Sequence, residues 1–385
     1  MPEELTSRER VLRFLRREKV DRIPCFAGMG NVLIEEIEKL GWHFGDLHRD
    51  PHKMAVAAAT MYPATGLECA VVPYDAYLEA ESIGSEVEFY EERREMQKIL
   101  YPIILHEWMD NLMKADLDIL KKKKASESGR IPMVADAVQE AKRLIGEDVV
   151  IGVCTGGPYG IAGTVDTVTD LSKAMLKNRW RVKEFLKILA DYVIEETRYF
   201  REAGADFVCT CEETCATEIL HPEVYKEVIV PGLQQVMAGI DPPLIIHTSG
   251  DMDLDLPYFI RTGADFLAVE QKCHIYRARQ IFNGTGIRLM GNIDIFLLLA
   301  KSDPENVDGQ VKTVITEGID AIWPAANIWP EAPVENVKAM VEACKKYSDP
   351  ENPVPGTYWW RSGVWESKYM ATGIQTMYPH CKLTD

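Results

Sequence analysis

Three residues with metal-binding side chains, Glu212, Glu227 and His247, are spaced along the middle of the chain, with fourteen residues between the glutamates and nineteen before the histidine. His247 ends a short apolar run and is followed by a turn at Gly250. This pattern predicts a buried parallel strand that delivers His247 to the C-terminal edge of a sheet. Ligands bind at that edge in α/β folds. Two carboxylates and an imidazole there predict a zinc site with three protein ligands and an open fourth position.

Two of the predicted ligands, His247 and Glu227, also have a purely structural interpretation. A histidine at a strand end is often only hydrogen-bonded, and Glu227 lies in a helical pattern where it would be an ordinary surface residue. A rival metal cluster is Cys209-x-Cys211-x₃-Cys215, because closely spaced thiolates bind zinc. Cys209 and Cys211 share one face of a predicted strand, so we interpret them as small apolar core residues.

The elements that must position these residues follow a repeated order of strand, turn and helix. Helical patterns cover 168–203, 223–239, 254–262, 304–317 and 334–347. We predict eight strands, near 23–27, 68–73, 149–154, 205–211, 243–247, 264–269, 287–292 and 319–323.

Four similar turns support one repeated architecture. Gly66, Gly204, Gly263 and Gly318 each lie between a helix end and an apolar strand, and an acidic residue follows two positions later. Glycine is favoured just after a helix, where φ is positive. Eight such units close into a single (β/α)₈ TIM barrel, and an open doubly wound sheet is the alternative.

We predict a barrel domain at 1–347 and a C-terminal extension at 348–385. The N-terminal helix begins with the capping box Thr6-Ser-Arg-Glu9. An insertion at 75–147, rich in charged residues, separates the second and third strands. The extension is rich in aromatic residues, which predicts packing on the barrel or on the second subunit of a homodimer, or else a roof over the site.

Composition limits the partners. The net charge is −17, from 60 acidic and 43 basic residues, which argues against nucleic acid and anionic membranes. The apolar runs are too short to span a bilayer, and the charged N-terminus has no signal core. Nine cysteines in irregular spacing are typical of reduced thiols, so we expect a cytoplasmic protein.

Apolar and polar side chains at the predicted strand ends suggest a pocket for a small ring. Such pockets have apolar walls and a few placed polar groups. The predicted substrate-binding residues are Phe26, Met29, Asn31, Tyr74, Tyr159, Met290 and Trp323.

Short motifs in a fixed order resemble the uroporphyrinogen decarboxylase superfamily, which includes corrinoid-dependent methyltransferases and folds as a (β/α)₈ barrel. The resemblance covers residues 7 to about 347. The motifs are Ser7-Arg-Glu-Arg-Val-Leu with Asp21-Arg-Ile-Pro24, Gly157-Pro-Tyr-Gly-Ile-Ala162, Leu220-His-Pro-Glu-Val-Tyr225, Ile246-His-Thr-Ser-Gly250, Leu289-Met-Gly-Asn-Ile-Asp294 and Pro333-Val-Glu-Asn-Val-Lys-Ala-Met340.

The branches of this superfamily differ in their chemistry. Decarboxylases carry an arginine-rich turn after the first strand, whereas the turn at 26–31 has no basic residue. The branch that methylates thiols binds zinc through His-x-Cys and a distant Cys. In this chain Ser249 stands at the Cys position of the His-x-Cys pair, and the distant Cys would fall near Ala326, so both cysteines are missing. Phenyl methyl ether O-demethylases have the pattern Glu-x₁₄-Glu-x₂₀-His, which Glu212, Glu227 and His247 match except for one residue in the second gap.

The resemblance implies a zinc-dependent methyltransferase that moves a methyl group from a vanillate- or veratrole-like methyl ether to a Co(I) corrinoid. Glu212, Glu227 and His247 would hold the zinc, with Glu213 as the substitute for Glu212. No Asp-x-His-x-x-Gly corrinoid motif is present, so the corrinoid would be carried by a partner protein. The alternatives are a methylcorrinoid:thiol methyltransferase of the coenzyme M type, a decarboxylase-like lyase, and a metal-free binding protein.

Overall fold

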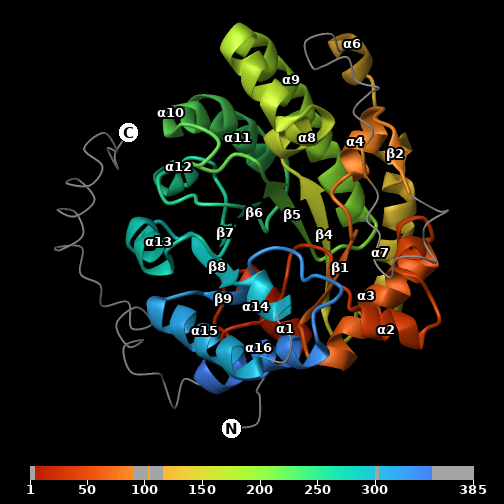
Figure 1. The fold of residues 1–385 in the computed structure, drawn as a ribbon, viewed down its shortest axis with the longest axis vertical. Coiled ribbons are helices and arrows are strands. Elements are labelled where there is room, and N and C mark those ends of the chain that lie inside the picture. Colours follow the sequence, from red (N-terminus) through yellow and green to blue (C-terminus); the bar gives the residue numbers. More distant parts are fainter. Residues whose placement is uncertain (1–4, 90–102, 105–115, 300–302, 349–385) are drawn as a thin grey trace.

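The computed structural model describes residues 5–89, 103–104, 116–299 and 303–348, so the predicted extension lies almost wholly outside the described residues. Parallel strands curl into a barrel, and helices surround it (Figure 1). The sheet order is β1-β4-β5-β6-β7-β8-β9, with every pair parallel. The strands are β1 (Cys69–Val72), β4 (Val150–Gly156), β5 (Phe207–Glu212), β6 (Ile245–Thr248), β7 (Phe266–Val269), β8 (Arg288–Ile293) and β9 (Ala321–Pro324).

The first predicted strand is reduced to a single parallel bridge between Cys25 and Ile322. Around it, the Phe26 N–H donates to the Ile322 carbonyl at 3.1 Å, and the Cys25 carbonyl accepts from the Glu68 N–H at 3.0 Å. The segment around Cys25 therefore lies between β9 and β1 and takes the place of the eighth strand of the barrel. This arrangement confirms a TIM-barrel-like fold, and the other seven predicted strands appear as β1 and β4 to β9.

The described helices cover the outside of the barrel, and α1 closes its N-terminal end by packing Phe14 against Phe26 and Phe266. The capping box of α1 is present as predicted. The helices are α1 (Ser7–Leu15), α2 (Ile34–Lys39), α3 (Pro51–Thr65), α4 (Leu78–Ile83), α6 (Leu117–Leu120), α7 (Ile131–Ile145), α8 (Pro158–Val165), α9 (Val168–Glu202), α10 (Pro222–Val224), α11 (Val230–Gly239), α12 (Leu256–Phe259), α13 (Ile275–Phe282), α14 (Ile295–Leu299), α15 (Pro304–Glu317) and α16 (Val334–Tyr347).

The predicted insertion contributes α4, α6 and α7 and a small antiparallel hairpin of β2 (Val87–Glu88) and β3 (Ile103–Ile104), although part of it lies outside the described residues. Between α10 and α11, residues 225–229 form one turn of π-helix.

The four repeated turns have the backbone that the sequence predicts, since Gly66, Gly204, Gly263 and Gly318 all have positive φ. The acidic residue two positions later has a common role. In each turn its carboxylate accepts the backbone N–H at the start of the neighbouring strand. These bonds run from Cys25 to Glu68, from Ile151 to Asp206, from Leu244 to Asp265 and from Leu289 to Asp320.

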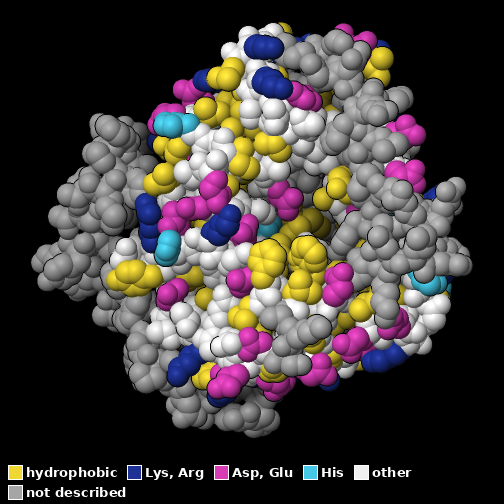
Figure 2. Space-filling model, in the orientation of Figure 1, with side chains coloured by type: hydrophobic (Ala, Val, Ile, Leu, Met, Phe, Trp, Pro, Cys, Tyr) yellow, Lys and Arg dark blue, Asp and Glu magenta, His cyan; other side chains and the backbone are white. Residues whose placement is uncertain are grey.

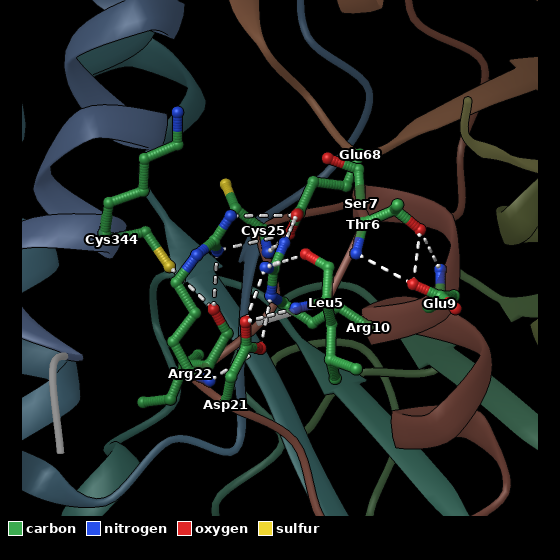
Figure 3. Close-up of polar contacts among 12 residues, drawn as sticks. Leu5, Thr6, Ser7, Glu9, Arg10, Asp21, Arg22, Cys25, Glu68 and Cys344 are labelled. Carbon is green, nitrogen blue, oxygen red and sulfur yellow. Dashed lines mark hydrogen bonds and ion pairs between the residues drawn. The ribbon is translucent and has the colours of Figure 1, made fainter. Parts of the chain in front are cut away.

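The acid of the first turn lies at the centre of a buried charge cluster on the barrel floor (Figure 3). Glu68 pairs with Arg10 at 2.5 Å and with Arg22 at 2.9 Å. Arg10 also contacts Asp21 at 2.7 Å. The cluster joins α1, the segment before Cys25 and the start of β1. It therefore holds these elements together at the end of the barrel that lies opposite the expected site.

Candidate active site

A cavity of about 460 Å³ opens at the C-terminal end of the barrel strands. The space-filling view shows a hollow there with hydrophobic side chains around it (Figure 2). Its walls come from the segment that follows Cys25 and from the ends of β1, β4, β5, β8 and β9 and the segments that follow these strands. The lining includes Met29, Pro73, Tyr74, Asp75, Tyr77, Glu79, Cys154, Thr155, Ile161, Thr164, Cys211, Glu213, Thr214, Ile295, Asn327 and Trp329.

The charged residues that line the cavity within the described chain are all acidic. Asp75 is neutralised by Arg130, whose two terminal nitrogens donate to it at 2.9 and 3.0 Å. The Glu79 carboxylate accepts the Gly156 N–H at 2.6 Å, and burial raises its pKa to about 7. The described lining residues therefore offer no Lys or Arg to pair with an anionic substrate.

His247 lies on β6, fully buried, and neither of its ring nitrogens has a hydrogen-bond partner in the described structure. It stands in register with Cys211 on β5 and Ala268 on β7. Burial lowers its pKa to about 4, so the ring is neutral and can offer a lone pair. A buried polar group without a partner costs free energy, and binding of a ligand by the ring would offset that cost. This side chain fits a metal ion.

Glu212 lies on β5, and in the described structure its carboxylate contacts the N-terminus of a helix. Its carboxylate accepts the Gly160 N–H at 2.6 Å and the Tyr159 N–H at 3.4 Å, which caps the N-terminus of α8. A Cβ at Gly157 would lie 2.6 Å from this carboxylate, which explains the glycine there. Burial raises the Glu212 pKa to about 8. The Glu212 carboxylate therefore lies at the N-terminus of α8.

Glu213, the predicted substitute, does line the cavity. Burial raises its pKa, while a hydrogen bond with the Ser249 side chain opposes the rise. Ser249 occupies the second place of the His-x-Cys pattern, so this bond links that place to the cavity wall.

Glu227 lies on the π-helical turn, where 49% of its side chain is exposed, and it pairs with Arg179 at 3.1 Å. The structure does not bring it together with His247. Over the described ranges, no group of three or more His, Cys, Asp or Glu side chains is already arranged to hold a metal.

Two cysteines that the sequence did not connect meet at the cavity. Cys154 on β4 and Cys211 on β5 have their sulfurs 3.0 Å apart, and the second is 4.0 Å from Cys209. The bond to Cys211 and burial raise the Cys154 pKa well above its usual value. Cys215 is separate, because its thiol donates to the Glu212 carbonyl instead. The rival cluster is therefore not a single group.

Of the predicted substrate-binding residues, Met29 and Tyr74 line the cavity. Phe26 and Trp323 are wholly buried and pack on each other inside the barrel, with ring centroids 5.0 Å apart, and Met290 is also wholly buried. Asn31 accepts the Ile328 N–H at 2.7 Å and so joins two loops. Tyr159 is buried and its hydroxyl has no partner in the described structure.

Sequence reasoning missed Glu79, Cys154 and Trp329 as lining residues. Glu79 lies in the insertion, where its charge resembled that of a solvated surface. Cys154 gave a usable signal, because it ends a predicted strand as His247 does. Trp329 lies beyond the last strand and had no such signal.

The chain belongs to the uroporphyrinogen decarboxylase (URO-D) family. The model of that family matches residues 6–347, which is almost the entire described barrel. This match confirms the resemblance drawn from the motifs and agrees with the closed barrel.

Among its relatives is the methylcobamide:CoM methyltransferase MtaA of Methanosarcina barkeri (strain Fusaro / DSM 804), 27% identical over 89% of this chain and 99% of the relative. The methylated-thiol–coenzyme M methyltransferase of Methanosarcina mazei is 25% identical, over 92% of each chain. A solved structure of a methyltransferase from Methanosarcina mazei superposes with a TM-score of 0.80, at 25% identity over 89% of this chain and 99% of that one.

Proposed function

We propose that this protein transfers a methyl group between the corrinoid of a separate protein and a small substrate in the cavity. The supporting observation is the alignment with the methylcobamide:CoM methyltransferase over 99% of its length. That protein's name makes a thiol the first substrate class to test. The methyl group would pass from methyl-Co(III) to a thiolate, which yields a thioether and Co(I).

The charge of the cavity narrows the choice of thiol. Coenzyme M carries a sulfonate, and the described lining offers Asp75, Glu79 and Glu213 but no Lys or Arg. Burying an unpaired anion beside carboxylates is unfavourable. We therefore propose a neutral thiol rather than a sulfonated one.

The second candidate is the aromatic methyl ether that the ligand spacing suggests. Two observations favour it: Ser249 and Ala326 stand where the thiol branch has cysteines, and Tyr74, Tyr77 and Trp329 give the cavity aromatic walls. In this direction Co(I) takes the methyl group and the phenolate takes a proton. The same charge argument favours neutral veratrole over anionic vanillate.

We propose that zinc binds at His247 in either case. Of the sequence-predicted ligands, Glu213 lines the cavity as the substitute for Glu212, while the described conformation leaves Glu227 at the surface. A bound zinc ion supplies Lewis acidity, which stabilises a thiolate or a leaving phenolate. The cavity walls orient the substrate and exclude water from it.

The test uses the purified chain with a corrinoid partner protein in two arms. One arm follows methyl-Co(III) with neutral thiols and coenzyme M, and the other follows Co(I) with veratrole and vanillate. We expect a spectral change between methyl-Co(III) and Co(I) in one arm, faster with the neutral substrate. Inert behaviour in both arms with every corrinoid partner would contradict the proposal.

A further inference from the structure

One carboxyl group on the cavity wall is placed to exchange a proton with a bound substrate. Glu79 lies on α4 and lines the cavity, although only 4% of the residue is exposed. Its Oε1 atom accepts the Gly156 N–H at 2.6 Å, which fixes the carboxyl group at the end of β4. We propose that Glu79 gives or takes the proton that methyl transfer in this cavity requires, an inference that rests on the proposed function.

The reaction needs such a group in either direction. When a thiol attacks methyl-Co(III), the C–S bond forms, the C–Co bond breaks with its electron pair left on Co(I), and the thiol proton must leave. When Co(I) attacks an aryl methyl ether, the C–Co bond forms, the C–O bond breaks, and the phenolate must gain a proton. A carboxyl group that exchanges its proton near the working pH can serve as base in the first case and as acid in the second.

The other acidic residues of the described lining suit this role less well. Burial would raise the Asp75 pKa, but Arg130 and His48 together hold it well below its usual range, so Asp75 stays ionised. Burial raises the Glu213 pKa, while the Ser249 side chain opposes that rise. Glu213 is also a candidate zinc ligand, a role that would keep it ionised.

No cation among the described residues pairs with Glu79. Burial raises its pKa to about 7, against the opposing effect of the backbone N–H bonded to it. Arg130, at the start of α7, directs its Nε to Glu81 at 2.6 Å and its two terminal nitrogens to Asp75. The Cys154 thiol on β4 is neutral, because its bond to another thiol and its burial raise its pKa well above the usual value. Glu79 therefore keeps its proton up to about neutral pH.

The helices packed around α4 add neutral groups near Glu79. Glu196 on α9 is wholly buried, and neither of its carboxyl oxygens has a partner in the described structure. Burial and the charge of Glu79 raise the Glu196 pKa well above its usual range, so this acid stays protonated. One turn earlier on α9, the Tyr192 hydroxyl donates at 2.6 Å to Ser82, which lies one turn after Glu79 on α4. On α8 the titratable side chain is Tyr159, which is also neutral because burial raises its pKa.

The experiment compares the unaltered protein with Glu79→Gln, which removes the titratable proton, and with Glu79→Asp, which shortens the side chain but keeps a carboxyl group. Glu86→Gln is the matched control, because Glu86 is an exposed acid just after α4. Infrared spectra of the protein alone follow the carbonyl band of protonated carboxyl groups as pH is raised. The rate of methyl transfer is measured over the same pH range with the corrinoid partner protein and the substrate, and circular dichroism checks folding.

We expect the unaltered protein and Glu86→Gln to lose a carboxylic acid band as pH rises through about 7, and Glu79→Gln to lack that band. Transfer to a thiol should become faster through this pH, because the Glu79 carboxylate then accepts the proton, whereas demethylation of an ether should become slower. In Glu79→Gln this inflection should vanish and kcat should fall about 100-fold, the lower end of what general acid–base groups contribute. In Glu79→Asp the band and the inflection should remain at a shifted pH.

An infrared band near neutral pH that persists in Glu79→Gln, or an unchanged kcat and pH profile in that variant, would overturn the proposal. If Glu79→Gln does not fold, an unshifted band and an unshifted inflection in Glu79→Asp would overturn it equally. A band assigned to Glu79 in a protein that transfers no methyl group with any corrinoid partner would support the position of the proton and contradict the proposed function alone.

Discussion

At the scale of single residues, Glu212 shows that sequence spacing locates a residue on a strand without fixing which side of the strand its carboxylate occupies. The sequence locates it correctly at the end of a buried strand, but successive strand residues point to opposite sides. Cys211 and Glu213 line the cavity, whereas Glu212 faces the N-terminus of α8. A one-residue step along the strand therefore separates a side chain that lines the cavity from one that caps a helix. His247 has no such ambiguity, because its register with Cys211 fixes its face.

The cap makes a testable prediction about pH. Burial raises the Glu212 pKa from 4.5 to about 8, so between these values the folded state binds a proton that the unfolded state has released. The free energy of unfolding therefore falls as pH rises through this window, at up to about 1.4 kcal/mol per unit. Urea denaturation across this pH range should show a flatter profile for Glu212→Gln than for the unaltered protein. Zinc content should stay unchanged in this variant, and its loss would instead assign Glu212 as a ligand.

At the scale of elements, most of the barrel could be predicted because its turns repeat. Helix ends, positive-φ glycines and apolar strands are local features, and the four repeated turns were found where expected, as at Gly204 and Gly318. The role of the following acid could not be predicted, because it depends on which strand lies alongside. The length of the first predicted strand, 23–27, was overestimated, since only Cys25 forms a bridge. The cavity wall from the insertion depends on tertiary packing that no local pattern encodes.

We expect a large loss of stability when one charge is removed from the floor cluster, the buried group of Arg10, Asp21, Arg22 and Glu68. Glu68 is wholly buried between Arg10 and Arg22, so Glu68→Gln leaves two buried guanidinium groups short of a counter-charge. We expect the free energy of unfolding to fall by about 3–5 kcal/mol in urea titrations. The control is Glu227→Gln, which breaks an exposed pair and should cost less than about 1 kcal/mol. Equal effects of the two variants would show that the floor cluster has no special role.

At the scale of the whole molecule, the described residues place site and stability determinants at opposite ends of one barrel. The charge cluster fixes the floor, and the cavity, His247 and the thiol pair lie at the other end. Over the described residues no helix is long and apolar enough to cross a membrane. The homodimer and the cytoplasmic location remain predictions from composition. We expect a corrinoid partner protein to approach the C-terminal end of the barrel, the mouth at which the cavity opens.

Large exposed apolar side chains lie in the segments that follow β5, β6, β7, β8 and β9 in the chain. They are Ile219, Leu254, Tyr276, Phe296 and Trp329. Exposed apolar groups clustered near a site mark a protein interface. If the corrinoid protein docks there, Phe296→Asp, at a side chain that is 60% exposed, should raise the KM for that protein about tenfold, for a loss of about 1.4 kcal/mol. Turnover with free methylcobalamin should be unchanged, because the cavity is intact. Leu144→Asp, an exposed leucine near the end of α7, is the control and should alter neither rate. An equal loss with free cobalamin would place the effect of Phe296 in the site rather than in docking.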